Sequence, residues 1–279
     1  MSMLKTTILL AALMGLFLVV GFLLGGVPGL IIAFVLGAGM NFFAYWSSDK
    51  LALRMAKARE VSMQEQPKLH SIVEEVAAQA GMPKPKVYVI ESDTPNAFAT
   101  GRNPKHAAVA VTTGIMRLLS ERELRAVMGH EMGHVKNRDI LISSIVATIA
   151  GAISMLALIS LFFRNSRSPY GGLLFIVAWI VAPLAAGVIR AAISRTREFQ
   201  ADITGAEVTH DPEALASALE KLHEGVRARP MEATPMAEST AHLYIVHPFK
   251  AGGIANLFST HPPMEERVRR LRDMAYRPR

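Results

Sequence analysis

The 279-residue chain contains no cysteine, and charged residues make up only 19% of it. The lack of cysteine excludes disulfide bonds and thiolate metal ligands, so any bound metal ion must be held by histidine and carboxylate side chains. The scarcity of charge accompanies a hydrophobic content of 51%. Because a soluble domain of this length usually carries more charge and fewer apolar residues, the composition favours a protein that is partly embedded in a membrane.

The sequence also lacks a basic run with interleaved aromatic residues, so it gives no support to nucleic-acid binding. The net charge is nevertheless +7. Lys5 precedes the first apolar run, and four basic residues follow the second: Lys50, Arg54, Lys57 and Arg59. Under the positive-inside rule these residues place the N-terminus and the polar segments in the cytoplasm. Arg164 and Arg167 oppose this orientation, but they are outnumbered.

Four apolar runs approach or reach the length that crosses a bilayer, roughly 20 residues of α-helix. They comprise residues 6–24, 27–46, 140–163 and 171–189. The first does not read as a signal peptide, because it leads through a glycine-rich turn directly into the second. We therefore expect a hairpin of two retained transmembrane helices, with the aromatic cluster at 42–46 at headgroup level. The later pair either crosses the membrane or forms buried helices of a soluble domain.

These runs divide the chain into four parts. Residues 1–46 form the N-terminal transmembrane hairpin, and residues 140–189 form the second apolar pair. Residues 47–139 and 190–279 supply the two parts of a cytoplasmic domain. The expected fold is mainly α-helical with a small β-sheet, in an integral membrane protein with up to four transmembrane helices.

The first polar part has a helical pattern at 67–80 that ends at Gly81. Alternating patterns predict three strands: 86–90, 98–100 and 107–112. Ser120 and Glu123 then form an S-x-x-E capping box, which opens a helix. The pattern allows this helix to run on into the third apolar run.

The second polar part contains two further helix starts. Asp211 and Pro212 supply an N-cap and a proline at the first helical position, and Pro263 opens a last helix through Met274. Residues 227–240 are rich in proline, methionine and small side chains, which predicts a loop.

The helix after the capping box carries the H-E-x-x-H pattern at His130, Glu131 and His134. Four residues along an α-helix rotate by about 400°, so both imidazoles project from one face, one turn apart, and can bind one tetrahedral ion. Glu131 lies beside the first imidazole, where its carboxylate can take a proton from an activated water. The pattern predicts a zinc-dependent hydrolase, although H-E-x-x-H also occurs by chance on ordinary helices.

A catalytic zinc site of this type needs a third protein ligand. The best candidate is Glu198, within the R-E-F-Q-A-D segment at 197–202. Asp202 follows one turn later on the same face, where it can orient a ligand imidazole. The alternative is that Glu198 pairs with Arg195 or Arg197 on an exposed helix, and spacing alone does not decide.

Together, H-E-M-G-H at 130–134 and R-E-F-Q-A-D at 197–202 resemble the HtpX family of membrane-bound zinc endopeptidases. T-P-N-A-F-A-T-G at 94–101 and F-S-T-H-P-P at 258–263 resemble two further signatures of that family, so the resemblance covers nearly the whole chain. It implies a zincin-like, gluzincin-type domain with one Zn²⁺ per chain. The resemblance implies that His130, His134 and Glu198 are the zinc ligands and that Glu131 is the general base. It also implies that Asp202 contacts a ligand imidazole without binding the metal itself.

The resemblance also implies a location and a task. The location is the bacterial inner membrane, with several spans and an active site that faces the cytoplasm. The task is stress-linked quality control, in which misfolded or damaged membrane proteins are the substrates. Charged residues at 121–125 and 136–139 flank the metal motif and would cost several kcal/mol each at mid-bilayer, so we expect the site at the cytoplasmic interface.

Substrate contacts are less sharply defined. The strand at 98–100 is expected to be an edge strand that offers backbone hydrogen bonds to an extended substrate. Asn96 either binds substrate at its start or caps the turn after Pro95. His261 either stabilises the oxyanion, acts as a transient fourth ligand or caps the last helix, and Tyr244 is a weaker oxyanion candidate.

Two other functions compete with this prediction. One is a processing protease for prenylated C-terminal peptides, which shares the metal motifs but has more transmembrane spans. The other is a catalytically silent membrane adaptor that keeps the zinc fold, and Glu131 argues against it because an adaptor needs no base there. No feature of the sequence sets the oligomeric state.

Overall fold

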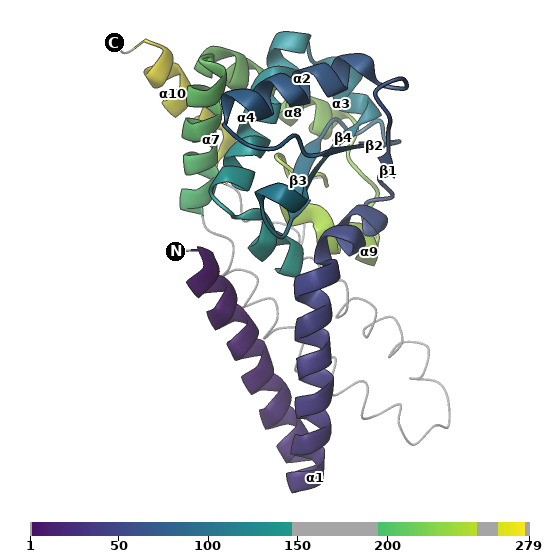
Figure 1. Cartoon of the computed structure of the whole chain (residues 1–279). Helices are drawn as coiled ribbons and strands as arrows, with labels where there is room; N and C mark the ends of the chain where they lie inside the picture. The colour runs from purple at the N-terminus through teal and green to yellow at the C-terminus, as the bar shows by residue number, and fades with distance from the viewer. Residues whose placement is uncertain (1, 147–194, 250–261, 277–279) are drawn as a thin grey trace.

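The computed structural model describes residues 2–146, 195–249 and 262–276. Within these ranges the protein is mainly α-helical with one small sheet, as expected (Figure 1). Most of the second apolar pair falls in 147–194, and His261 also lies outside the described residues. The expectations about both therefore stay predictions.

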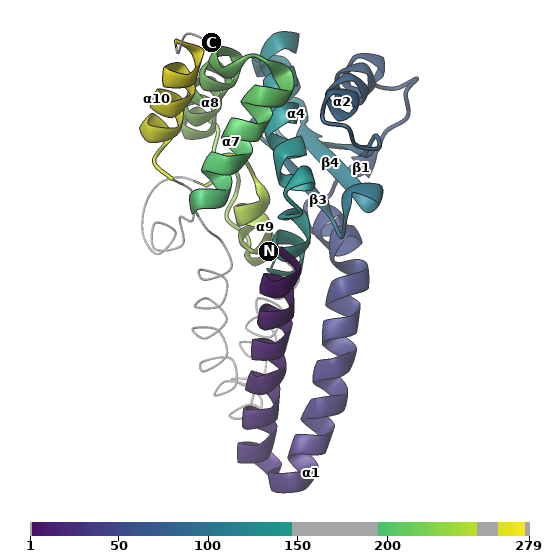
Figure 2. The ribbon, with the colours of Figure 1, turned by 60° about the vertical axis from the view of Figure 1, so that its left-hand side comes forward.

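Helix α1, Ser2–Met55, consists of two arms that join at Gly25 and Gly26. Gly26 has φ 57° and ψ −141°, a conformation that glycine adopts readily and other residues avoid. Pro28 lies in the first turn of the second arm, where its fixed φ suits a helix start. The chain reverses at this point, so both outer ends of α1 lie near the polar domain (Figures 1 and 2).

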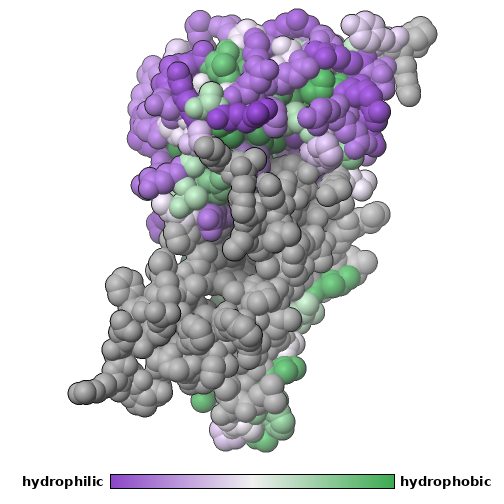
Figure 3. Space-filling model, turned by 180° about the vertical axis from the view of Figure 1, so that it is seen from behind, coloured by the Kyte–Doolittle hydropathy of each residue, from purple (hydrophilic) through white to green (hydrophobic). Residues whose placement is uncertain are grey.

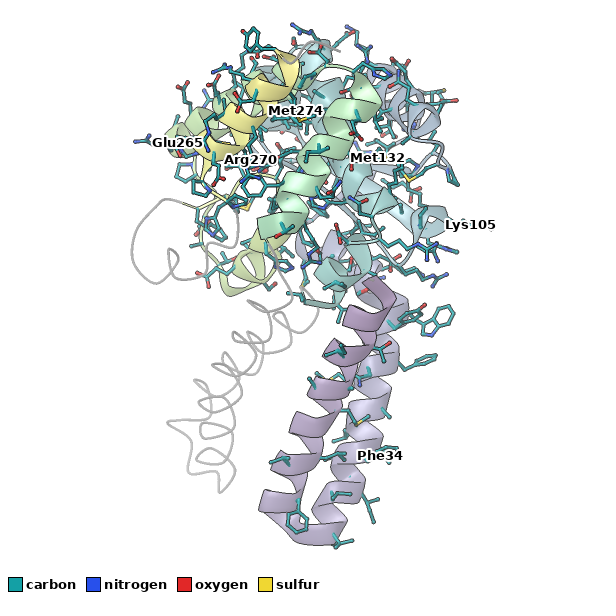
Figure 4. All side chains as sticks on the ribbon, turned by 90° about the vertical axis from the view of Figure 1, so that its left-hand side faces the viewer. Phe34, Lys105, Met132, Glu265, Arg270 and Met274 are labelled. Atoms are coloured by element: carbon teal, nitrogen blue, oxygen red, sulfur yellow. The ribbon has the colours of Figure 1, made fainter. Side chains whose placement is uncertain are left out.

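The second arm of α1 has the properties of a membrane span. Among the described residues, Gly25–Phe43 is the segment that is long and apolar enough to cross a bilayer. Its large apolar side chains are exposed rather than packed in a core, namely Val27, Ile31, Ile32, Phe34, Val35 and Leu36. Figure 4 shows Phe34 projecting from this arm, well away from the polar domain.

Four strands form a mixed sheet: β1 (Arg59–Glu60), β2 (Lys86–Ile90), β3 (Ala97–Gly101) and β4 (Ala107–Thr112). The order is β1-β2-β4-β3, with β2 and β4 parallel and the other pairs antiparallel. The three predicted strands are confirmed. Strand β1 has only two residues, too few for an alternating pattern, and was not predicted.

The two faces of this sheet are covered by different parts of the chain. Val87, Val89 and Val111 belong to the large core beneath the helices. Their neighbours along the strands point the other way, because side chains alternate across a strand. Phe98 and Ala110 accordingly join a smaller cluster with the end of α1 and Tyr244. The sheet thus lies between the end of α1 and the helical core.

The remaining helices, labelled in Figures 1 and 2, are α2 (Pro67–Gln79), α3 (Thr113–Leu118), α4 (Glu121–Lys136), α7 (Arg195–Thr209), α8 (Pro212–Ala228), α9 (Pro235–Thr240) and α10 (Met264–Ala275). The chain also has two short 3-10 helices, η1 (Pro104–His106) and η2 (Ala241–Leu243). Helices α7 and α8, from the second polar part, pack against α4 from the first. One domain is therefore assembled from both sides of the second apolar pair.

The predicted helix starts are confirmed. Ser120 and Glu123 form the reciprocal capping box of α4, and the backbone N–H of Ser120 donates to the Glu123 carboxylate at 2.9 Å. The Asp211 carboxylate accepts from the amide of Ala214 at 3.0 Å at the start of α8. Helix α10 begins directly after Pro263, which occupies the N-cap rather than the first turn.

The structure corrects the prediction that α4 can run on into the third apolar run. Helix α4 ends at Lys136, and Arg138 adopts a left-handed conformation with φ 58°. The amide of Asp139 then donates to the carbonyl of His134 at 2.9 Å, which closes the end of the helix. A new helical segment covers residues 140–146.

The predicted loop at 227–240 is also corrected. Helix α8 continues through Ala228, and residues 235–240 form α9. Thr234 caps α9, because its hydroxyl accepts from the amide of Ala237 at 3.1 Å. Pro235 stands at the first helical position, where its missing N–H costs nothing. A cap followed by proline therefore starts a helix where composition alone indicated a loop.

Candidate metal centre

The structure brings His130 and His134 of α4 together with Glu198 of α7. The two Nε2 atoms lie 3.2 Å apart. Oε1 of Glu198 is 3.5 Å from Nε2 of His134, and Oε2 is 3.9 Å from Nε2 of His130. Among the described residues, this is the group of histidine and carboxylate side chains with the spacing of a metal site.

These separations fit a zinc ion. Zinc–nitrogen and zinc–oxygen bonds of about 2.0–2.1 Å in a tetrahedron place neighbouring ligand atoms roughly 3.3–3.4 Å apart. Glu198 is only 8% exposed, and its carboxylate faces the two imidazoles. It is therefore not the solvent-exposed partner of an arginine, which was the alternative from the sequence.

Each imidazole has a carboxylate behind it. Oδ1 of Asp202 lies 2.9 Å from Nδ1 of His130, and Oδ2 of Asp139 lies 3.6 Å from Nδ1 of His134. Such contacts fix the orientation of the ring and leave Nε2 for the metal. Asp202 was predicted for this position. Asp139 was not, because it reaches His134 only through the unpredicted break after α4.

Arg267 of α10 is a second charged residue at the site that was not predicted from the sequence. It is fully buried, and its Nε and Nη2 donate to the two oxygens of Asp202 at 2.8 and 2.7 Å. Its Nη1 donates to the carbonyl of Ile245 at 3.0 Å. The sequence did contain a signal, because Arg267 lies on the same helical stripe as Met264 and Leu271, where a charge is unexpected.

Burial and charge perturb the titration of this cluster. Burial lowers the pKa of His130 to about 4, although the Asp202 carboxylate opposes the shift. Burial acts in the same direction on His134, but the carboxylates of Glu198 and Asp139 outweigh it and raise that pKa to about 9. His130 is thus neutral at pH 7, and the carboxylates that hold a proton on His134 would equally stabilise a divalent cation.

Glu131 is 1% exposed, and burial raises its pKa to about 7. The backbone amide of Ala99 in β3 hydrogen-bonds to its carboxylate. Within the described part of the chain, Oε1 of Glu131 has no hydrogen-bond partner. Glu131 lines a cavity of about 20 Å³ together with His130, His134 and Glu198, which is enough room for a water molecule. A buried carboxylate oxygen without a partner, beside three candidate metal ligands, suits proton transfer to or from such a water.

Comparison with known proteins agrees with this geometry. The family model described as "Peptidase family M48" matches residues 63–275. The chain belongs to peptidase family M48. Two curated proteins named "Protease HtpX homolog" are each 53% identical to it. The one from Paraburkholderia phytofirmans aligns over 97% of this chain and 96% of its own length, and the one from Persephonella marina over 99% of both. The expected membership of the HtpX family is confirmed.

The fold has a solved relative. The crystal structure of S. mikatae Ste24p matches with a TM-score of 0.53 at 20% identity. The match covers 97% of this chain and 65% of that protein. This match shows the fold alone. The M48 family model and the HtpX relatives show that the chain is a membrane-bound metalloprotease, and the cluster on α4 and α7 is where its described residues can hold the metal.

Glycine residues allow helices α4 and α7 of this M48 protein to approach closely. A Cβ on Gly205 of α7 would lie 2.6 Å from the backbone nitrogen of His130. A Cβ on Gly133 of α4 would lie 2.9 Å from the carbonyl oxygen of Ala201. Larger residues at either place would force α7 away from α4 and carry Glu198 away from the histidines. Gly133, at a variable position of the H-E-x-x-H pattern, therefore has a packing role.

The predicted substrate-contacting residues are distributed differently. Tyr244 lines the cavity and packs edge-on against Phe98, with ring centroids 5.2 Å apart. Asn96 is fully buried and does not line the cavity. Its amide group donates to the carbonyl of Val246 at 2.6 Å and accepts from the Val246 amide at 3.3 Å. His242, which sequence reasoning missed, also lines the cavity, and its Nε2 lies 3.0 Å from the carbonyl of Ser143.

Strand β3 is at the edge of the sheet, as predicted, but its outer side is partly occupied. The amide of Ile245 donates to the carbonyl of Ala97 at 3.0 Å. The amide of Gly101 donates to the hydroxyl of Ser144 at 3.4 Å. Asn96 fixes this arrangement through Val246. The prediction of a freely available edge therefore needs correction for this structure, since residues 244–246 lie along it.

Proposed function

We propose that the chain is a zinc endopeptidase of the bacterial inner membrane, which cleaves cytoplasmic segments of misfolded or damaged membrane proteins. In this proposal His130, His134 and Glu198 hold one Zn²⁺, and Glu131 is the general base. The observation that carries it is the spacing of three donor atoms at tetrahedral distances beside the unpartnered oxygen of Glu131.

The residues have separate tasks in peptide hydrolysis. Zinc, when bound, supplies a Lewis acid that acidifies water and polarises the scissile carbonyl. Glu131 has a pKa of about 7, so it can accept a proton from the attacking water and deliver it to the leaving amine near neutral pH. Tyr244 and His242 line the same cavity and are the candidates for a hydrogen bond to the developing oxyanion.

The residues behind the ligands keep these groups in place. Asp202 and Asp139 hold the two imidazole rings, and Arg267 lowers the pKa of Asp202 despite its burial. An ionised Asp202 accepts from His130 and keeps that ring's other nitrogen directed at the metal position. Asp202, Asp139 and Arg267 therefore act as one unit with the two imidazole rings.

The membrane placement follows from the distribution of apolar and charged surface. Figure 3 shows that the surface of the polar domain is mainly hydrophilic, whereas the coloured part of α1 is mainly hydrophobic. We infer a multi-pass protein whose α1 arms cross the bilayer and whose polar domain lies in the cytoplasm. Lys50 and Arg54 support this orientation, because basic residues that flank a membrane span favour the cytoplasmic side. The active site then meets peptide segments outside the bilayer rather than transmembrane helices.

Substrate recognition through β3 would suit a clearance protease. A polypeptide that pairs with the outer edge of β3 is held by backbone hydrogen bonds, which accept many sequences. The present cavity is too small for a peptide, so residues 244–246 would have to leave the edge first. Relatives that are 53% identical over nearly their full length carry the name protease HtpX, which favours this function over a prenyl-peptide processing enzyme or a silent adaptor.

The expected activity can be tested on purified full-length protein in detergent. The substrate is a multi-pass membrane protein, offered folded and after thermal unfolding, and cleavage sites are mapped by mass spectrometry. We expect cleavage of the unfolded form at sites in its extramembrane loops, loss of cleavage with a zinc chelator and recovery on addition of Zn²⁺. Cleavage confined to transmembrane segments, or to a prenylated peptide supplied in parallel, would contradict the proposal.

A further inference from the structure

A stripe of exposed residues on α1 changes from aromatic to basic within two helical turns. Phe42, Trp46, Lys50 and Arg54 follow one another at four-residue spacing, so they lie on one face of the helix. Phe42 is 67% and Trp46 is 47% exposed, and their ring centroids are 6.0 Å apart. Lys50 and Arg54 are also exposed.

The turn between β3 and β4 lies against this stripe. The guanidinium carbon of Arg102 stands 4.6 Å from the centroid of the Trp46 ring. Asn103 holds the turn, because its side-chain oxygen accepts from the amide of His106 at 3.1 Å. Lys105 is exposed, and Figure 4 shows it projecting outward from the edge of the domain, near the upper end of α1. The polar domain thus places two cations beside the aromatic end of the second arm.

No carboxylate in the described part of the chain forms an ion pair with Lys50, Arg54, Arg102 or Lys105. Glu60 pairs with Lys86 at 3.0 Å and accepts from the hydroxyl of Tyr88 at 3.0 Å. Asp49 precedes Lys50 on α1, and its carboxylate accepts from the backbone amide of Lys50 at 2.8 Å. The surface made by Phe42, Trp46, Lys50, Arg54, Arg102 and Lys105 therefore combines aromatic rings with an excess of positive charge. We call it the basic-aromatic surface.

We propose that the basic-aromatic surface binds the phosphate headgroups of anionic phospholipids in the cytoplasmic leaflet. The inference rests on the proposed placement of α1 in the bilayer. Trp46 to Lys50 rises roughly 6 Å along the helix, which matches the polar layer of roughly 5–8 Å on each side of the hydrocarbon. Aromatic rings favour the inner boundary of that layer, and lysine and arginine favour anionic lipid phosphates just outside it.

This contact is coupled to the active site through one short strand. Arg102 directly follows Gly101, the last residue of β3, and Ala99 of the same strand hydrogen-bonds to Glu131. Only two residues therefore separate Ala99, which contacts Glu131, from Arg102, which contacts Trp46. A headgroup that holds Arg102 therefore holds the end of β3, and anionic lipid is expected to raise proteolytic activity by fixing this strand.

The first test measures lipid binding without relying on cleavage. Full-length protein carrying Glu131→Gln, in a neutral detergent, is titrated with phosphatidylglycerol or phosphatidylcholine, and its thermal midpoint is followed. We expect phosphatidylglycerol to raise the midpoint and phosphatidylcholine to have little effect. R102Q and K105Q each remove one positive charge. Each substitution should lower the apparent affinity for phosphatidylglycerol by about fivefold.

Lys68→Gln is the matched control, because Lys68 has an 83% exposed side chain on α2 and lies outside the basic-aromatic surface. It should leave the response unchanged. Equal responses to both lipids, or an unchanged response in Lys105→Gln and Arg102→Gln, would overturn the proposal. An equal midpoint shift with inorganic phosphate alone would also overturn it, since it would identify a phosphate site rather than a lipid surface.

The second test uses active protein in vesicles of either lipid. Cleavage should be faster in phosphatidylglycerol, and Arg102→Gln should remove most of this difference while the activity in phosphatidylcholine is retained. Absence of any lipid-dependent difference, with normal zinc-dependent cleavage, would refute the coupling and leave the proposed protease function intact.

Discussion

Replacement of Glu131 by glutamine is expected to reduce casein cleavage by about 10²–10⁴-fold, the usual contribution of a general base. Glutamine has nearly the same shape but cannot accept the proton of the attacking water. The zinc content should stay at one ion per chain, because Glu131 is not among the three donor groups that face each other. Peptidase rates and metal content measured on the same preparation would separate the base from the ligands.

Glu121→Gln provides the matched control for this prediction. Glu121 lies in the first turn of the same helix, but it is exposed and pairs with Lys68 at 2.8 Å. Surface pairs of this kind contribute little, so activity and zinc content should both be unchanged. Substantial cleavage by the Glu131→Gln protein would contradict the mechanism, and loss of zinc from it would show that Glu131 is a ligand instead.

Arg267→Met is expected to destabilise the protein by about 3–5 kcal/mol, the cost of leaving a buried charge without its partner. The fully buried Arg267 neutralises Asp202 through two hydrogen bonds and lies 3.9 Å from Glu198. Without the guanidinium, Asp202 becomes easier to protonate and holds His130 less firmly. Chemical denaturation of the full-length protein would measure the loss, and zinc affinity should fall with it.

A second substitution distinguishes charge balance from simple packing. Adding Asp202→Asn to Arg267→Met removes the unpaired carboxylate, so part of the stability should return. Zinc affinity should not recover fully, because asparagine is a poorer partner for His130. Arg269→Met, at an exposed position of the same helix, is the control and should be nearly neutral. An Arg267→Met protein with unchanged stability and zinc affinity would show that the buried Arg267–Asp202 pair does not support the site.

The candidate metal ligands could be predicted from the sequence because their geometry is local. His130 and His134 share a face through the 3.6-residue period, and the capping box at Ser120 fixes where their helix begins. Glu198 and Asp202 obey the same period on α7, so the sequence predicts their mutual spacing. Only the distance between the two helices had to come from the fold.

The supporting residues could not be read in the same way, since each depends on a contact between distant segments. Asp139 reaches His134 because Arg138 takes a left-handed conformation, which arginine does not signal. Arg267 reaches Asp202 from α10, 65 residues further along the chain. The close approach of Gly205 to His130 is likewise visible only when α4 and α7 are packed. Local patterns predict ligands, whereas tertiary packing decides what holds them.

X-ray absorption at the zinc edge tests the central claim most directly. The Glu131→Gln protein, which should not cleave itself, is compared with a second variant that also carries Glu198→Ala. We predict one zinc per chain, with two imidazole nitrogens and oxygen at about 2.0–2.1 Å, and a marked loss of zinc when Glu198 is removed. Full zinc occupancy with an unchanged spectrum in the Glu198→Ala variant would contradict the account, because residue 198 would then not complete the site.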